Sequence, residues 1–541
     1  MPAGVPVSTP RRSSATPPRA QPTADQEFPL MAHEDILDEL DRRRAAACAM
    51  GGEEKLARRR ERGTLNAEER LDALIDEGSF YETGFLGRSS FSAQAAGKSP
   101  RDGKITGFGT IDGRDVGVVV NDFTTMGAST GATNSKKIGY IRKTCTEKGM
   151  PFVHVGESTG ARLPDAMGSR GMGQMLGNDT TQFRRMRESP WAAAALDTSF
   201  GSSAWLCCCA DFAVMKKGSI MSVSSPRLVS MAIGEKVELE ELGGWRIHAE
   251  QTGLIDQFVD TDEEAMAALR RFLSYMPGHN GELPPTAPVA EGSGDDQERI
   301  LDILPETRNR VYNMKKIIDV IFDVGSVFEF KPRFGKSAVV ALARLEGKVV
   351  GVVANNPQVG GGALSAEACR KIIDFTVLCD SFNIPIVRLM DTPGFVVGTD
   401  AERRGAPGHI MNFMNATCLT TVPQVTVICR KAYGRAYVAM GGGAHNDSMI
   451  AWPMAEVSFM DPVFATSIVH NRTPGDEGFE DALIEIQKDL EIWDMATIFS
   501  AHDVIKPQET RSSLIRILDI HQRRRSGGIG DHLMRSWPTS Y

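Results

Sequence analysis

The chain has 541 residues, a formal net charge of −8 and 41% hydrophobic residues. This length exceeds what one hydrophobic core usually spans, so we expect two domains. The negative charge argues against a broad basic surface for nucleic acid, and no apolar run reaches the roughly 18 residues that a membrane span needs. Nine cysteines without a CxxC pair indicate neither a disulfide framework nor a metal site. We therefore expect a cytoplasmic protein without bound metal, a partner nucleic acid or a membrane.

Residues 1–30 are expected to be a disordered tail. They are rich in Pro, Ser, Thr and Ala, and six prolines before Asp25 prevent an amphipathic helix. The alternative is an organellar transit peptide, because Arg11, Arg12 and Arg19 stand in a stretch without acidic residues.

Helices are expected first along the chain, and strands after them. Apolar residues recur on one side of residues 33–48, and Asn66 with Glu69 forms a capping-box pattern before a second helix. From Gly103 onward, two strands joined by a turn at residues 112–113 precede a helix over residues 135–148. Short strands, Gly-rich turns and intervening helices are typical of the α/β class.

Residues 151–164 organise this part of the chain. The apolar run 152–155 predicts a short buried strand, and the small residues of 157–161 predict a turn after it. Such a turn leaves backbone N–H groups pointing outward, which makes a site for negative charge.

The same pattern returns 234 residues later. Gly113, Gly117, Asn121, Glu157 and Gly160 correspond to Gly347, Gly351, Asn355, Asp391 and Gly394. A second pair of turns, at residues 200–205 and 433–438, matches at an offset near 233. Coincidental reuse of common α/β signals is the alternative, but one offset without a gap indicates a duplication. We expect a first domain over residues 31–286, a linker over 287–297 and a second domain over 298–541.

Two backbone N–H donors aimed at one oxygen stabilise a developing oxyanion, and losing one typically costs about 2.7–4 kcal/mol. A single Gly-rich turn is more often structural, whereas four turns related by duplication are a more specific signal. Other catalytic patterns (GxSxG, HExxH, Walker A) are absent from the sequence. We interpret His154 as a core histidine, residues 207–209 (CCC) as buried, and residues 184–187 as a solvated helix face, with phosphate binding as the alternative for the last.

The chain resembles the carboxyltransferase β-subunit of biotin-dependent acyl-CoA carboxylases, the propionyl-CoA and methylcrotonyl-CoA carboxylase family, over roughly residues 33–521. The stretches that carry the resemblance are LDALIDEGSFYE at 71–82, GKITGFG at 103–109, ESTGAR at 157–162, FNIPI at 382–386, DTPGF at 391–395, RKAYG at 430–434, AWPMAE at 451–456 and DVIKP at 503–507.

The resemblance implies an α/β fold made of two tandem, duplicated crotonase-like carboxyltransferase domains. It implies a dimer unit stacked into a hexamer, with each active site between the N domain of one protomer and the C domain of another. Carboxybiotin would release CO2 and take the α-proton of an acyl-CoA, whose enolate attacks the CO2. The chain has no EAMKM biotinyl segment and no recognisable ATP-grasp region, so we expect a separate biotin carboxylase and biotin carrier subunit as partners.

The resemblance also implies the site residues. Thr159 and Gly160 would form the acyl-CoA oxyanion hole, and Arg435 and Ala436 the hole for the biotin ureido oxygen. The substrate-binding residues would be Ser158, Ala161, Arg162, Gly201, Gly394, Phe395, Tyr433, Gly434, Tyr437 and Val438. Thr159 and Arg435 stand where propionyl-type members have glycine, although methylcrotonyl-type members resemble the GRAY run at 434–437.

Two alternatives to carboxylation remain within this fold. A decarboxylase or transcarboxylase subunit would use the same turns, because the direction of transfer is not written in them. A non-catalytic scaffold subunit is the second alternative, and the departures at Thr159 and Arg435 motivate it.

Overall fold

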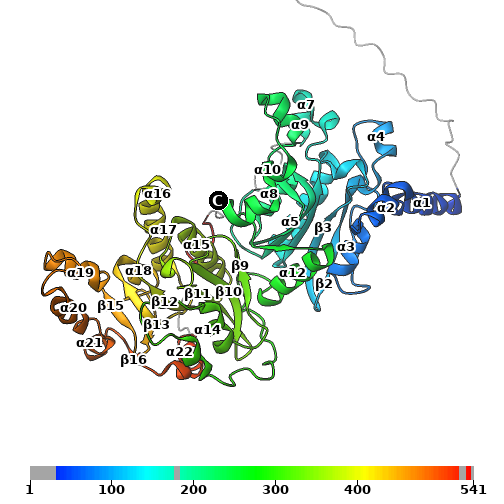
Figure 1. Cartoon of the computed structure of the whole chain (residues 1–541). Helices are drawn as coiled ribbons and strands as arrows, with labels where there is room; N and C mark the ends of the chain where they lie inside the picture. The colour runs from blue at the N-terminus through cyan, green and yellow to red at the C-terminus, as the bar shows by residue number, and fades with distance from the viewer. Residues whose placement is uncertain (1–31, 176–182, 523–531, 538–541) are drawn as a thin grey trace, which may run out of the picture.

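The structure, a computed structural model, describes residues 32–175, 183–522 and 532–537 (Figure 1). The expected tail at residues 1–30 lies outside them. Two lobes lie side by side, each built around one sheet, and helix α1 projects from the first lobe (Figure 1). The first lobe holds β1 to β8 with α1 to α12, and the second holds β9 to β16 with α13 to α22.

The strands of the first sheet are β1 (Tyr81–Glu82), β2 (Lys104–Ile111), β3 (Arg114–Asn121), β4 (Phe152–Ser158), β5 (Trp191–Phe200), β6 (Phe212–Lys216), β7 (Ile220–Ser222) and β8 (Gln257–Val259). Those of the second are β9 (Phe328–Phe330), β10 (Ala338–Leu345), β11 (Lys348–Asn355), β12 (Ile386–Thr392), β13 (Gln424–Tyr433), β14 (Ser448–Ala451), β15 (Glu456–Ser458) and β16 (Asp503–Val504).

The helices of the first lobe are α1 (His33–Cys48), α2 (Glu53–Glu61), α3 (Ala67–Leu74), α4 (Ala93–Gly97), α5 (Ala132–Lys148), α6 (Leu163–Ala166), α7 (Gly168–Met175), α8 (Ser202–Cys209), α9 (Pro226–Ile233), α10 (Leu239–Gly243), α11 (Trp245–Ile247) and α12 (Asp262–Tyr275). Those of the second lobe are α13 (Arg299–Ile303), α14 (Met314–Ile321), α15 (Ala366–Ser381), α16 (Thr399–Arg403), α17 (Ala406–Leu419), α18 (Gly434–Ala439), α19 (Pro462–Val469), α20 (Phe479–Lys488), α21 (Ile492–Thr497) and α22 (Thr510–His521).

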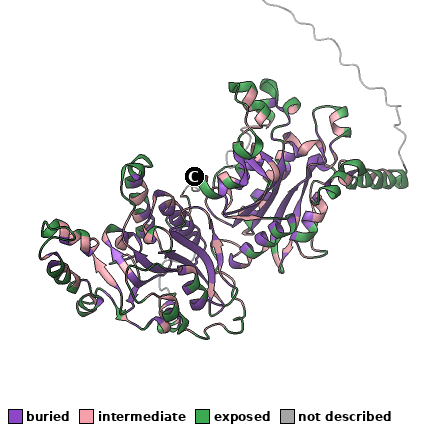
Figure 2. Ribbon diagram, viewed as in Figure 1, coloured by how far each residue is buried: buried purple, intermediate pink, exposed green. Residues whose placement is uncertain are grey.

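The two sheets repeat one topology. Their strand orders are β1-β2-β3-β4-β5-β6-β8 and β9-β10-β11-β12-β13-β14-β16, and β7 and β15 pair with β5 and β13. An antiparallel hairpin (β2–β3, β10–β11) leads in each lobe into parallel strands. The strands are buried and the outward helix faces exposed (Figure 2). The expected tandem duplicated α/β fold is therefore confirmed, whereas the domain boundaries stay a prediction.

The repeated glycines have a packing reason. A Cβ on Gly117 of β3 would lie 2.2 Å from the Cys145 sulfur of α5. A Cβ on Gly351 of β11 would lie 2.5 Å from the Cys379 sulfur of α15. Helix and strand thus approach closely at equivalent places, and only glycine leaves that space. The same contact is therefore present in both lobes, at positions 234 residues apart.

The lobes share a core and are joined by polar contacts. Phe212 of the first lobe packs on Phe328 of the second, with ring centroids 5.4 Å apart. The buried Lys331 ammonium lies 2.8 Å from Asp374 and 3.3 Å from Asp256, and it donates to the Gly253 carbonyl at 2.6 Å. Because Asp256 and Gly253 belong to the first lobe, this lysine ties the two lobes together.

Several local expectations are confirmed and two are corrected. Helix α1 spans the expected residues, and the Asn66 side chain caps α3 with Glu69 bonding back to the Asn66 N–H. Helix α5 begins three residues earlier than expected, at Ala132. The solvated-helix interpretation of residues 184–187 is wrong, because these residues are not helical and the largely covered side chains of Arg185 and Arg187 pair with Asp211 at 2.5 and 3.3 Å.

Candidate active site

The first candidate turn follows β4. Gly160 has φ +92°, a conformation that L side chains rarely adopt. Its carbonyl accepts from the Thr130 N–H at 2.8 Å. The Thr159 N–H donates to the Gly127 carbonyl at 2.9 Å, and the Gly160 N–H donates to the Ser158 hydroxyl at 3.1 Å. The Gly160 amide thus has only a side-chain acceptor two residues away, which a ligand oxygen could replace.

Buried neighbours hold this turn in place. The Ser158 hydroxyl donates to the Ala128 carbonyl at 3.0 Å, and Arg162 pairs with the buried Asp102 at 2.6 Å. Ala161 forms an isolated bridge with Thr130. Ser158 and Arg162 therefore act inside the protein, whereas Thr159 is exposed.

A second turn joins β5 to α8 and meets the first. A Cβ on Gly201, which has φ +60°, would lie 3.6 Å from the Gly160 Cα. Strands β4 and β5 are parallel neighbours, so their carboxyl ends bring the two turns to one edge of the sheet. The first amides of α8 have no intrahelical acceptor and carry the positive end of the helix dipole. Backbone donors from two turns can thus converge on one oxygen.

The second lobe repeats this pair of turns after β12 and β13. The Gly394 N–H donates to the Thr392 hydroxyl at 3.2 Å, as the Gly160 N–H does to Ser158. Gly434 has φ +59° and begins α18, whose first turn contains the exposed Arg435 and the buried Ala436. Phe395 packs against the main core.

The hydroxyl groups of the two tyrosines near this turn, Tyr433 and Tyr437, already form hydrogen bonds within the protein. Tyr433 is buried, and its hydroxyl donates to Glu456 and accepts from Arg308, each at 2.5 Å. Burial and Glu456 raise the pKa of Tyr433. The Tyr437 hydroxyl accepts from the Gly443 N–H at 2.9 Å, and Val438 is half-buried. Tyr433 thus supports the Gly434 turn from inside.

A cavity of about 780 Å³ opens beside Thr159 in the first lobe. Its lining residues are Lys55, Arg58, Arg59, Arg62, Thr64, Phe123, Thr124, Gly127, Glu157, Thr159, Asp197, Thr198, Gly218, Ile220, Leu239 and Glu240. Four of them are cations contributed by α2 and the residue after it. Phe123, Ile220 and Leu239 give it apolar walls, so the cavity suits a ligand with an anionic and an apolar part. Arg435 and Ala436 of the second lobe are not among its lining residues.

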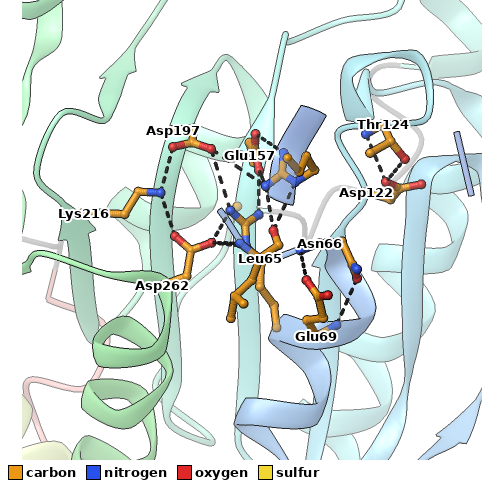
Figure 3. Close-up of polar contacts among 12 residues, drawn as sticks. Leu65, Asn66, Glu69, Asp122, Thr124, Glu157, Asp197, Lys216 and Asp262 are labelled. Atoms are coloured by element: carbon orange, nitrogen blue, oxygen red, sulfur yellow. Dashed lines mark hydrogen bonds and ion pairs between the residues drawn. The ribbon is translucent and has the colours of Figure 1, made fainter. Parts of the chain in front are cut away.

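A group of six charged side chains, three of which line this cavity, lies at its wall: Arg59, Arg70, Glu157, Asp197, Lys216 and Asp262 (Figure 3). We call it the buried ion network. Glu157, the buried acid of β4, forms ion pairs with Arg59 at 2.9 Å and with Arg70 at 2.6 Å. Burial alone would lower the pKa of Arg70, but the charges of Glu157 and Asp262 raise it above its usual value. The network anchors the start of the Thr159–Gly160 turn to helices α2 and α3.

The second lobe neutralises the equivalent acid differently. Asp391 replaces Glu157 at the offset of 234, and Arg430 of β13 lies 3.1 Å from it. Burial raises the pKa of Asp391, an effect that Arg430 opposes. Here the cation comes from the neighbouring strand rather than from distant helices.

The remaining polar candidates do not contribute a nucleophile. His154 is 1% exposed, and burial lowers its pKa to about 3, as expected for a histidine packed in the core. Cys208, in α8, has its pKa raised to about 11 by burial, so it is not a thiolate at neutral pH. Within residues 32–175, 183–522 and 532–537, no three His, Cys, Asp or Glu side chains are arranged to hold a metal ion.

Sequence reasoning missed Asp197 and the cations of the buried ion network. Arg59 lies 98 residues from Glu157 along the chain, so no local pattern pairs them. The run of basic residues at 58–60 was the one available signal.

In the described part of the chain, no helix has the length and apolar character needed to cross a membrane.

Residues 58–528 match the family model described as the carboxyl transferase domain. The propionyl-CoA carboxylase beta chain of Roseobacter denitrificans is 37% identical over 89% of this chain and 95% of its own length. The methylmalonyl-CoA decarboxylase subunit alpha of Veillonella parvula is 31% identical over 90% of this chain and 95% of its own. The crystal structure of the transcarboxylase 12S hexamer superposes with a TM-score of 0.84 at 31% identity, covering 92% of this chain and 99% of that one. The chain therefore belongs to the carboxyl transferase family, that of the biotin-dependent acyl-CoA carboxylases.

Proposed function

We propose that the chain carboxylates an acyl-CoA at its α-carbon, or at a vinylogous carbon, through an enolate held by backbone amides. The observation that carries this proposal is the contact between Gly160 and Gly201, where two positive-φ turns meet beside the cavity. The amides of Gly160 and the first turn of α8 would hold the thioester oxygen as it gains charge, and the Thr159 amide would join them on leaving the Gly127 carbonyl, to which it donates at 2.9 Å. Backbone donors serve this role without a side-chain nucleophile.

The amides of Arg435 and Ala436 would hold the ureido oxygen of biotin on a separate carrier. Their place at the first turn of α18 suits that role, because those amides have no intrahelical acceptor and Arg435 is exposed. Carboxybiotin, when bound, supplies the CO2 and the base that takes the α-proton. The remaining substrate-binding residues are proposed to shape the two turns around these groups, with Phe395 and Tyr437 on the biotin side and Val438 lining the acyl pocket.

A second copy of the chain is proposed to complete each site. Every lining residue of the cavity belongs to the first lobe, whereas Arg435 and Ala436 belong to the second. Large apolar side chains are also exposed on both lobes, several of them on the same element. They include Met231 and Ile233 near α9 and Phe459, Phe464, Ile498 and Phe499 around α19 to α21. The relative transcarboxylase 12S is a hexamer, and a biotin-bearing subunit is the further partner we propose, in a cytoplasmic setting.

Labelled bicarbonate tests the reaction. The complete oligomer is supplied with propionyl-CoA, biotin carboxylase, biotinylated carrier and ATP. Acid-stable label in the acyl-CoA is the expected result. Loss of CO2 from methylmalonyl-CoA without ATP would instead support decarboxylation, the second candidate, which the likeness to the Veillonella parvula subunit favours. Neither reaction, with acyl-CoA binding intact, would identify a scaffold subunit.

The cations of α2 are proposed to bind the phosphates of CoA. Arg59 anchors α2 through Glu157, and the Lys55 ammonium donates to the Thr124 carbonyl at 2.7 Å. This fixes the helix so that Arg58 and the residue after its end, Arg62, line the cavity. Exposed guanidinium groups suit phosphate oxygens, with which they form paired hydrogen bonds.

Replacing Arg58 and Arg62 together by alanine should raise the KM for acyl-CoA about 5- to 30-fold, with kcat within about twofold. The reason is that each exposed charge pair contributes about 0.5–1 kcal/mol to binding of both ground and transition states. Arg60→Ala is the matched control, because Arg60 lies on the same helix but does not line the cavity. Steady-state kinetics at low and high salt measure the effect, and an unchanged KM in the double variant would contradict it.

A further inference from the structure

Asp197 occupies an unusual backbone position beside the cavity. It lies in β5 where pairing with β4 shifts register: Gly156 is opposite Ala195, but Ser158 is opposite Ser199. The extra residues form a bulge, and Asp197 within it has φ +47°. A non-glycine residue in this region is strained, and such strain persists mainly at functional sites. Its side chain is 37% exposed and lines the cavity together with Thr159.

The buried ion network does not need Asp197 to neutralise its cations. Without it, every cation of the network still has a carboxylate oxygen within 2.9 Å, from Glu157 or Asp262. Asp197 is the most exposed member of the network: 37% of its side chain is exposed, against 11% for Arg59 and 12% for Lys216. One Asp197 oxygen lies 2.9 Å from Lys216, and the other is 3.8 and 3.9 Å from Arg59 and Arg70. This second oxygen is beyond hydrogen-bond distance of both guanidinium groups.

The charge of Asp197 defines what it can bind. Burial alone would raise its pKa, but Lys216, Arg70 and Arg59 together hold the pKa below its usual value. The carboxylate is therefore ionised at neutral pH and can only accept hydrogen bonds. An O–H or N–H group of a ligand complements it, whereas an anionic group is repelled. The neighbouring lining residues Thr159 and Thr198 add polar hydroxyl groups to this wall.

We propose that Asp197 is a specificity-determining residue that selects acyl-CoA substrates whose acyl group carries a hydroxyl or amino donor. Alkyl groups of the same length leave the carboxylate oxygen without a partner in the enzyme–substrate complex, which a site built for a donor penalises. The inference rests on the proposed function, because it places the acyl group beside the turn at Thr159 and Gly160.

Matched thioesters test this selection. The ratio of kcat/KM for 3-hydroxypropionyl-CoA over propionyl-CoA, and for glycolyl-CoA over acetyl-CoA, is measured with the complete oligomer. Whichever of these two ratios is larger in the wild type should fall about 10- to 100-fold in Asp197→Asn, because the substitution removes the charge and keeps the side-chain size. Asparagine also tolerates the left-handed backbone. Asp197→Gly, which releases the strain, should lower the ratio to the same extent.

Asp112→Asn is the matched control. Asp112 also has positive φ, +51°, and pairs with Arg270 at 2.6 Å, but it lies in the β2–β3 turn outside the cavity lining. Its ratio should equal that of the wild type. An unchanged ratio in both Asp197 variants would overturn the inference, even if kcat/KM fell equally for both members of each pair. If the wild type carboxylates none of these thioesters, the proposed function fails; dissociation constants from titration calorimetry then still compare hydroxylated and plain thioesters in each variant.

Discussion

Gly160→Pro is expected to lower kcat about 100- to 1,000-fold while the protein stays folded and assembled. Proline removes the N–H that would bind the enolate oxygen, and its fixed φ near −65° is incompatible with the observed +92°. In the structure the Gly160 N–H bonds only to the Ser158 hydroxyl at 3.1 Å. That contact is local and readily exchanged for a ligand oxygen, so losing it should affect the transition state more than the fold.

Two companion variants separate strain from the lost donor. Gly160→Ala keeps the N–H, and its Cβ would meet Phe200 no closer than 3.7 Å, so only the positive φ opposes it. Gly78→Ala imposes similar left-handed strain at φ +70°, in the turn between α3 and β1. Turnover should fall most in Gly160→Pro, less in Gly160→Ala and not in Gly78→Ala. Wild-type turnover in Gly160→Pro, with the oligomer confirmed by size-exclusion chromatography, would eliminate Gly160 as an oxyanion donor.

The duplicated fold could be predicted because each copy preserves contacts that only particular residues allow. Gly117 with Cys145, and Gly351 with Cys379, mark the close approach of a helix to a strand in both lobes. Spacing in the sequence preserves such local pairs. The fold class and the duplication followed from them, and the location of the Gly160 turn at a strand end followed from the hydrophobic pattern.

The charged surroundings of the site could not be predicted in the same way. The ion pair between Arg59 and Glu157 joins residues 98 positions apart. Asp391, the equivalent of Glu157 in the second lobe, pairs with Arg430 instead. The positive φ of Asp197 depends on a register shift between two strands, which the hydrophobic periodicity of the sequence does not indicate. Likewise, Arg185 was expected in solvent but is buried against Asp211. Long-range pairing decided each of these positions.

Arg70→Met is expected to lower the free energy of unfolding of the first lobe by about 3–5 kcal/mol. Arg70 is 0% exposed and lies 2.6 Å from Glu157 and 2.8 Å from Asp262, so its loss leaves two buried carboxylates short of a partner. Arg59 and Lys216 then face the three acids of the network alone, and the one uncompensated buried charge costs more than the lost attraction itself. Thermal and urea unfolding of the complete protein measure the change, and turnover should fall with it because Glu157 begins the Gly160 turn.

Removing an acid together with Arg70 should recover part of this loss. In Arg70→Met/Glu157→Gln, Arg59 loses its buried partner, but the acids left beside the missing arginine, Asp262 and Asp197, already pair with Lys216 at 2.7 and 2.9 Å. A double-mutant cycle should therefore show a coupling of about 1–3 kcal/mol. Arg404→Ala is the control: Arg404 pairs with Glu367 at 2.8 Å but is 57% exposed, so it should change stability by less than about 1 kcal/mol. If Arg70→Met proved as mild as Arg404→Ala, the buried ion network would not be what holds the Gly160 turn in place.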